Sequence, residues 1–333
     1  MTADIASIFS LIIALFCPLV IVAFGGMFSE RSGVINLGLE GIMLFSAMFG
    51  CMTLQAFNTK GTDGSDICLV QGMEQLIVLL AIVVSVVSGV LFSFLLSFAA
   101  IKLKSNQTIT GTALNILAPA FGMILIFTVQ SATDTTVIIP SRVKLGIELA
   151  ISNPDNGFLK FMFSDLYLTT PIIIILIVLL SIVLYKTKLG LRLRACGENP
   201  QAADSVGINV KRMRYIGTSI SGALAGLGGL AYVLVTTSGF QPDVGVAGYG
   251  FLALAVMIFG NWKPLGIVVA GGLFVTLRVL ATNIDLPFLS NITESGQILA
   301  AIPYLVTIIA LMIFSKRSHA PKAEGIPYDK SVR

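Results

Sequence analysis

Long apolar stretches follow one another along the whole 333-residue chain, and they restrict its fold more than any other feature. A helix needs about 20 apolar residues to cross the roughly 30 Å hydrocarbon core of a bilayer. Stretches that reach or approach this length alternate with turn-forming and polar residues. They cover residues 5–28, 33–57, 75–101, 108–130, 166–186, 215–237, 246–261, 264–282 and 297–315. We therefore predict an all-α polytopic membrane protein with about nine (eight to ten) transmembrane helices.

The composition excludes most soluble classes of protein. Apolar residues make up 56% of the chain and charged residues 11%, and the mean hydropathy is +0.93. Because soluble domains carry about 25% charged residues, we exclude a cytosolic enzyme, a secreted domain and a nucleic-acid binder, and we expect lipid as the surroundings. The single histidine, His319, excludes a histidine-based metal site or a catalytic triad, and four scattered cysteines indicate neither zinc nor a disulfide framework. We expect no catalytic residues, no metal and no cofactor. A disulfide between Cys51 and Cys68 remains an open alternative.

The distribution of basic residues predicts the orientation. If the C-terminus lies inside, 16 of the 21 Lys and Arg residues fall on the inner side, four fall outside and Arg278 lies within a span. Lys and Arg accumulate in cytoplasmic loops of membrane proteins. We therefore expect the N-terminus outside and the C-terminus in the cytoplasm. Residues 1–320 then form one transmembrane domain, and residues 321–333 form a cytoplasmic tail.

Two of the predicted spans are irregular. Span 33–57 is rich in glycine near its start, and span 246–261 is short and begins within a glycine cluster. Glycine clusters can mark discontinuous helices that line a transport cavity, or they can simply let helices pack closely. One irregular span lies in each of two groups of four spans, 33–186 and 215–315, as an internal inverted repeat would predict. This correspondence favours the cavity interpretation.

The water-exposed loop 187–214 contains a predicted short helix between two basic ends. Asn199 can cap it, Pro200 suits its first turn and Gly207 suits the position after its end. A helix over about 200–206 is too short to be stable alone, so another element or protein must hold it. Its small residues, Ala202 and Ala203, suit insertion into a groove on a soluble partner. The alternative is an ordinary linker whose basic residues face anionic lipid.

Several motifs resemble the permease subunits of bacterial ABC importers for nucleosides and simple sugars, above all the shorter permease of purine-nucleoside uptake systems. The resemblance extends from about residue 15 to 315. The motifs are ERSGVINLGLEG at 30–41, LRACGENPQAA at 193–203, GFLALA at 250–255 and FGNWKPLG at 259–266.

The resemblance implies a membrane subunit of the bacterial cytoplasmic membrane that catalyses no covalent reaction. It implies three partners: a paralogous second permease (or a second copy), a cytoplasmic double-cassette ATPase and an extracytoplasmic substrate-binding lipoprotein. It also makes loop 187–214 the site that couples transport to the ATPase. The residues concerned are Glu198, Asn199, Pro200, Gln201, Ala202, Ala203 and Gly207. The sequence has no Gly-Lys pair, hence no phosphate-binding loop of its own, so the ATP site must lie on another chain.

Polar and aromatic residues within the spans are candidates for the substrate pathway. Asn36 and Glu40 share a helix face if the helix is continuous, and an ionisable group at membrane depth usually indicates function. Glu40 could bond a ribose hydroxyl or a base amino group, or it could bond a neighbouring span. Asn115 offers the same two roles. Tyr249 and Phe251 could stack on a base or could simply pack.

Two other functions remain open at this point. An ion-coupled secondary transporter usually carries several carboxylates at membrane depth, whereas only Glu40 qualifies here. An ABC permease for a ribose-like sugar would share the same motifs, and the sequence does not separate it from a nucleoside permease.

Overall fold

The structure is a computed structural model, and it describes residues 2–60, 67–69, 73–130, 136–139, 167–283 and 320–329. In this part of the chain helices dominate, and the strands are two or three residues long. The helices up to residue 130 are α1 (Thr2–Arg31), α2 (Leu39–Ala56), α3 (Glu74–Ser97), the π-helical turn η1 (Phe98–Lys102) and α4 (Gln107–Gln130). The later ones are α6 (Thr169–Lys186), α7 (Lys188–Glu198), α8 (Pro200–Ser205), α9 (Val210–Thr236), α10 (Tyr249–Phe259) and α11 (Pro264–Asn283).

The prediction of an all-α polytopic membrane protein is confirmed. Among the described residues, six helices are long and apolar enough to cross a bilayer, and α10 and α11 are shorter apolar helices. Eight predicted spans coincide with α1, α2, α3, α4, α6, α9, α10 and α11. The ninth, 297–315, lies outside the described residues, as do His319 and most of the loop 131–165. The inverted repeat stays a prediction.

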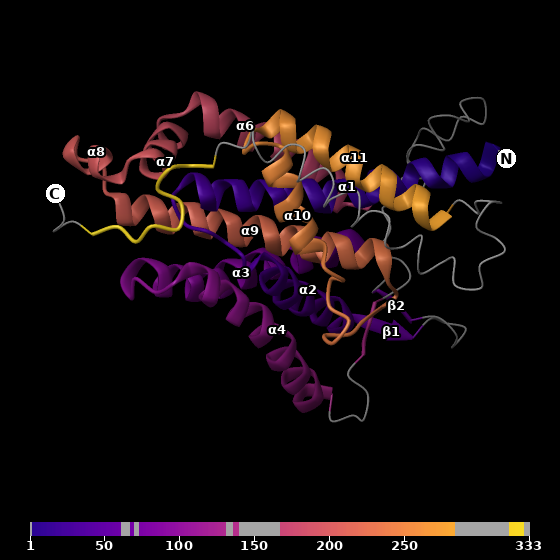
Figure 1. The fold of residues 1–333 in the computed structure, drawn as a ribbon. Helices are drawn as coiled ribbons and strands as arrows, with labels where there is room; N and C mark the ends of the chain where they lie inside the picture. The colour runs from indigo at the N-terminus through magenta and orange to yellow at the C-terminus, as the bar shows by residue number, and fades with distance from the viewer. Residues whose placement is uncertain are drawn as a thin grey trace, which may run out of the picture.

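Two small antiparallel pairs of strands close the end of the bundle that is opposite α8 (Figure 1). Strand β1 (Asn58–Lys60), which directly follows α2, pairs with β2 (Ile67–Leu69). Strand β3 (Val137–Ile138), after α4, pairs with β4 (Gly239–Phe240), after α9. This pairing joins the two regions. These pairs satisfy backbone groups where the chain leaves its helices.

Helices α1, α2, α3 and α9 form the core, and α9 packs against the other three. The middle of α1 is enclosed on all sides, since Leu19 through Phe24 have no exposed surface. In the most apolar part of α9, 78% of the residues are buried, against 22% in α4 and in α6. A helix that is apolar all round needs such enclosure or lipid. Helices α4 and α6 therefore form the outer layer, with isoleucine, leucine and phenylalanine on their outer faces.

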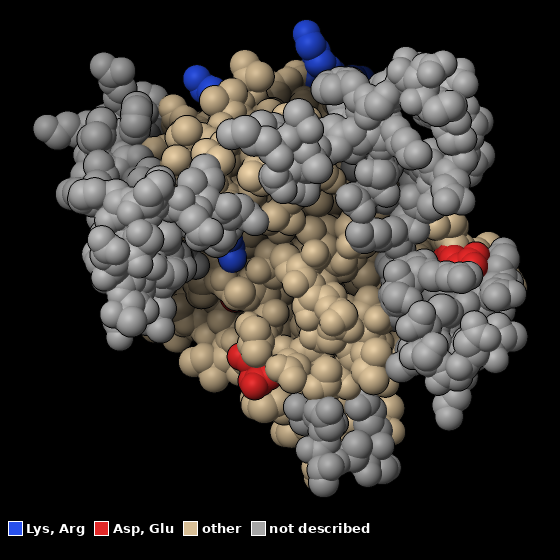
Figure 2. Space-filling view, turned by 90° about the vertical axis from the view of Figure 1, so that its right-hand side faces the viewer, with Lys and Arg blue, Asp and Glu red and all other residues tan. Residues whose placement is uncertain are grey.

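The basic segments gather at one end of the bundle, as the charge count predicted. Figure 1 shows α7, α8 and the C-terminal segment at this end, and the N-terminus and β1–β2 at the other. The carbonyl oxygen of Arg31 lies against Gly197 of α7, and Lys104 forms an ion pair with Asp329. Figure 2 faces the opposite end, where the described residues are mostly uncharged. Within the part of the chain that the structure describes, basic residues thus concentrate at the α8 end.

Glycines let α3 and α9 approach until their backbones touch. A methyl group on Gly89 of α3 would collide with the carbonyl oxygen of Gly222, and one on Gly226 would lie 2.5 Å from the carbonyl oxygen of Ser85. Ser85 also donates hydrogen bonds to the carbonyl oxygens of Ser46 (3.0 Å) and Gly226 (2.8 Å). Small residues and hydroxyl bonds of this kind are what holds helices together in lipid. We call this contact the glycine seam.

The glycine seam predicts that Gly89→Ala destabilises the protein although alanine favours helices. The added methyl group meets backbone atoms that cannot rotate away, so we expect a loss of about 1–3 kcal/mol. The measurement is the thermal unfolding temperature in detergent. Gly272→Ala is the matched control, because its methyl group would have 3.8 Å to the ring of Phe16. Equal unfolding temperatures for Gly89→Ala and the unchanged protein would contradict the seam.

Candidate functional site

The chain leaves the helical conformation between α1 and α2, at residues 32–38, where the irregular span 33–57 was expected to begin. Gly33 permits the break, because its φ of +92° is one that side chains with a Cβ rarely adopt. Asn36 lies in this link and is fully buried. Its side-chain amide donates to Ser221 Oγ of α9 at 2.9 Å, and its Oδ1 has no partner within the described residues.

One face of α4 supports this broken segment. The Gln107 side chain accepts a hydrogen bond from the amide of Ile35 at 2.7 Å. Two turns later Asn115 accepts from the amide of Gly41 and donates to the carbonyl oxygen of Leu37, both at 2.8 Å. Backbone groups freed by a break inside a membrane must be satisfied by the protein itself. Asn115 does this in the structure, which is the helix-bonding alternative considered for it.

The second break precedes α10, and Glu40 of α2 closes it. Its Oε1 accepts from the amide of Gly248 at 2.8 Å, and its Oε2 accepts from the amide of Gly250 at 2.6 Å. A carboxylate is favoured here because the free amides give a helix N-terminus a partial positive charge. Gly248 has a φ of +76°, and a methyl group on Gly250 would lie 2.6 Å from the Cα of Glu40. Because these glycines carry no side chain, Glu40 can approach the start of α10 closely. Glu40 itself lies just after the first break in the sequence.

Aromatic residues continue the cluster beside α10. Tyr249 is fully buried, and its hydroxyl donates to the carbonyl oxygen of Leu15 at 2.8 Å. Its ring centroid is 4.2 Å from that of Tyr232, and the guanidinium of Arg278 lies 5.1 Å from the ring. Phe251, by contrast, keeps 50% of its surface exposed. The rings therefore fix the N-terminus of α10 on its inner side and leave Phe251 on its outer side.

The structure brings the predicted pathway residues together around the two breaks but gives them different surroundings. Asn36, Glu40, Asn115 and Tyr249 are bonded to backbone or side chains of other helices. Phe251 is the member of the set that is half exposed. A role in the substrate pathway stays a prediction for all five.

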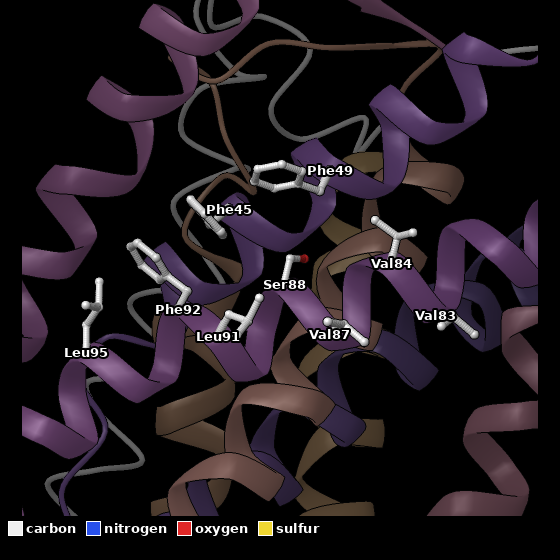
Figure 3. Close-up of a pocket in the computed structure, with 9 residues that line it drawn as sticks. All are labelled: Phe45, Phe49, Val83, Val84, Val87, Ser88, Leu91, Phe92 and Leu95. Atoms are coloured by element: carbon white, nitrogen blue, oxygen red, sulfur yellow. The ribbon is translucent and has the colours of Figure 1, made fainter.

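An apolar groove of about 470 Å³ between α2 and α3 was not predicted. Figure 3 shows Phe45 and Phe49 of α2 on one side and α3 side chains, Phe92 among them, on the other. The rings of Phe45 and Phe92 stack at 4.3 Å, and Phe45 also lies 5.6 Å from Phe121 of α4. The sequence shows these residues as ordinary apolar positions, so no local signal marked the groove.

The short helix in loop 187–214 is present; it begins where predicted and ends one residue earlier. Helix α8 runs from Pro200 to Ser205, the Asn199 side chain accepts from the amide of Ala202 at 3.0 Å, and Gly207 has a φ of +83°. Glu198, just before it, pairs with Arg31 of α1 at 3.6 Å. The loop is therefore a folded unit anchored to the transmembrane core.

The two alanines of α8 face in different directions. Ala203 is 3% exposed and packs against Cys196, Val210 and Met213 of α7 and α9. The exposed residues are Gln201, Ala202, Ser205, Val206 and Gly207, and Val206 has 74% of its surface exposed. Only one of the two residues expected to enter a partner's groove is thus available at the surface, and Val206 joins it.

Cys51 is a buried free thiol in the structure. The disulfide with Cys68 that the sequence left open is therefore absent.

The comparison with known families now becomes informative. A family model described as "Branched-chain amino acid transport system / permease component" matches residues 8–314. The chain belongs to this permease family. The match contains both helix breaks, Glu40 and the α8 unit, so these features belong to the family region of the permease.

Individual relatives cover nearly the whole permease. It is 36% identical to the guanosine ABC transporter permease protein NupQ of Bacillus subtilis, over 99% of this chain and 100% of the relative. It is 37% identical to the nucleoside ABC transporter permease protein NupC of Lactococcus lactis, over 94% of each chain. NupB of the same organism, also a nucleoside ABC transporter permease protein, is 25% identical over 95% of this chain and 82% of its own. No solved structure matches the permease.

The position of Glu40 predicts that its removal weakens the fold. In Glu40→Gln one of the two α10 amides faces an NH2 group instead of an oxygen atom, which costs about 1–3 kcal/mol for an unsatisfied buried donor. We expect a lower unfolding temperature in detergent. Glu74→Gln, at the partly exposed start of α3, is the control and should change little. If Glu40→Gln abolished transport at an unchanged unfolding temperature, Glu40 would act on the substrate instead.

Proposed function

We propose that this permease is a membrane subunit of an ATP-driven importer for nucleosides. The observation that carries the proposal is the similarity, over nearly the full length of both chains, to permeases named for guanosine and for nucleosides. The family match alone would leave the substrate open, because the description of the family names branched-chain amino acids and not nucleosides. A ribose-like sugar and ion-coupled transport are the alternatives, and neither of these two relatives favours them.

A second permease is the proposed partner within the membrane. Lactococcus lactis has two relatives, NupC and NupB, which differ in their identity to this chain and are both named as nucleoside permeases. This supports a paralogous pair over a homodimer. In such a pair the outer apolar faces of peripheral helices such as α4 and α6 are shared between lipid and the second permease.

The α8 end is the proposed docking site for a cytoplasmic double-cassette ATPase. It combines an anchored short helix with an exposed apolar side chain, Val206, outside the membrane-spanning helices. Burying this exposed side chain, which we call the apolar knob, in a partner would remove its surface from water and so stabilise the complex. This assignment puts the C-terminus in the cytoplasm of a bacterial cell, in agreement with the gathering of basic residues at that end. A substrate-binding lipoprotein then delivers its ligand at the opposite end.

The two helix breaks are the proposed wall of the substrate pathway. Discontinuous helices bind substrates in transporters because their free ends offer polar backbone groups within the membrane. Here the side chains of Glu40 and Asn115 already accept hydrogen bonds from these backbone amides. In this conformation the amides are therefore bonded within the protein and are not offered to a substrate. Phe251 is then the residue of the set best placed to stack on a nucleobase, since half of its surface is free.

Uptake by the assembled transporter tests the substrate. Proteoliposomes would contain this permease with its ATPase, second permease and binding protein, and radiolabelled guanosine would be supplied on the binding-protein side. We expect uptake that requires ATP and persists with a protonophore, and that unlabelled nucleosides inhibit. Inhibition by ribose but not by nucleosides would assign a sugar, and uptake driven by a proton gradient without ATP would assign an ion-coupled transporter.

The α8 surface predicts that Val206→Asp uncouples the ATPase without unfolding the permease. A charge at the apolar knob opposes its burial in a partner, and the side chain has little contact with its own chain. We expect at least a tenfold weaker association with the ATPase in pull-down assays, with an unchanged unfolding temperature. Val206→Ile is the matched control and should bind normally. Normal association of Val206→Asp would place the docking site elsewhere.

A further inference from the structure

The apolar groove between α2 and α3 opens at the surface of the membrane-spanning bundle. Val87, Leu91 and Leu95 of α3 line it and keep about half or more of their surface exposed (Figure 3). The lining is apolar except for Ser88, whose hydroxyl donates to the carbonyl oxygen of Ser85 at 2.9 Å. A nucleoside would lose its hydrogen bonds to water in such a groove without replacing them. The groove therefore does not suit the proposed transport substrate.

The groove is also too narrow for a helix of another protein. It runs along α3 from Val83 to Leu95, which is about 18 Å at a rise of about 1.5 Å per residue. Its volume of about 470 Å³ then corresponds to a mean cross-section of about 26 Å², whereas a helix about 10 Å across needs about 80 Å². An extended peptide would leave its backbone groups without hydrogen bonds against this lining. A single acyl chain of a lipid is the occupant that fits.

The apolar face of the groove continues along α3 toward the α8 end as far as Phe98. This residue follows Leu95 by three positions and Leu91 by seven, so it lies on the same face of the helix. The ammonium group of Lys102 lies 5.3 Å from the centre of the Phe98 ring. A charged side chain belongs at the edge of the hydrocarbon core, and Leu95 is about 10 Å further along the helix. The groove therefore lies inside the roughly 30 Å hydrocarbon core, with Lys102 at the edge of that core.

Lys102 provides a positive charge at this end of the groove. Its side chain is exposed, and within the described residues it forms no ion pair. The neighbouring Lys104, by contrast, is paired with Asp329. Basic residues just outside a membrane span attract anionic headgroups. The acyl chain and the headgroup of one phospholipid would thus meet complementary surfaces on one continuous face of α3.

We propose that the groove binds one acyl chain of an anionic phospholipid and that Lys102 binds its phosphate group. The lipid lies in the leaflet on the α8 side, which is the cytoplasmic leaflet in the proposed orientation, but its binding does not depend on that orientation. Phe45 of α2 stacks on Phe92 of α3 at the groove and also approaches Phe121 of α4. The bound chain therefore stabilises the packing of three helices, including α4, which supports the link before α2.

Native mass spectrometry of the purified full-length chain tests the headgroup. Phosphatidylglycerol and phosphatidylcholine with identical acyl chains would be added in equal amounts to the delipidated protein in detergent. We expect one phosphatidylglycerol molecule to bind in preference, and to bind about fivefold more weakly to Lys102→Gln. Lys188→Gln removes another exposed lysine at the α8 end, so it is the matched control and should bind this lipid normally. Equal binding of the two lipids, or unweakened binding of phosphatidylglycerol to Lys102→Gln, would overturn the proposal.

A substitution at an exposed lining position tests the groove itself. In Leu91→Trp the larger side chain occupies the groove, so we expect this variant to lose the binding of both lipids. Added phosphatidylglycerol should raise the unfolding temperature of the unchanged protein in detergent but not that of Leu91→Trp. Leu76→Trp is the matched control, because Leu76 is an exposed residue of α3 outside the groove, and it should respond to the lipid normally.

Two results with Leu91→Trp would contradict the groove as a lipid site. The first is lipid binding equal to that of the unchanged protein. The second is weaker association with the second permease at unchanged lipid binding, which would assign the groove to a protein interface. Neither measurement requires transport, so failure of the lipid site and failure of the proposed transport function are distinguishable.

Discussion

The structure depends on one requirement of the bilayer, which is that a helix interrupted in lipid must find hydrogen-bond partners inside the protein. Two non-helical links occur here, one before α2 and one before α10, and side chains of other helices bond the backbone of each. The link before α2 is held by Gln107 and Asn115 of α4, and the start of α10 is held by Glu40 of α2. Because Glu40 stands just after the first break and closes the second, the two breaks form a single structural unit.

This arrangement changes how polar residues in the spans should be interpreted. An ionisable residue at membrane depth is by default a candidate for function. Glu40 instead has both oxygen atoms engaged with backbone amides, and Asn115 has both polar atoms of its side chain engaged as well. These residues act on a substrate only if the helices they hold rearrange. A transport cycle that opens the wall would therefore exchange these internal hydrogen bonds for bonds to the substrate.

The sequence predicted those features that are encoded locally. Apolar length located the eight described spans, glycine clusters located both helix breaks, and capping residues located α8 to within a residue. Contacts between distant segments were not predictable, because periodicity and capping carry no information about partners. Glu40 and Gly248 are 208 positions apart, and the faces of Ala202 and Ala203 depend on how α8 packs on α7 and α9. The contacts of the C-terminal segment 320–329 were missed for the same reason, since they join its backbone groups to Gly197 and Arg214 and no local pattern marks them.

The glycine seam has a mechanical consequence. Helices whose backbones are in van der Waals contact cannot slide past each other without steric overlap, so α3 and α9 move as one body. Helix α9 has 27 residues and is therefore about 40 Å long, enough to reach from the α8 end to the opposite face. The α8 end of the bundle and the opposite end are therefore joined by one continuous helix whose central part is locked to α3.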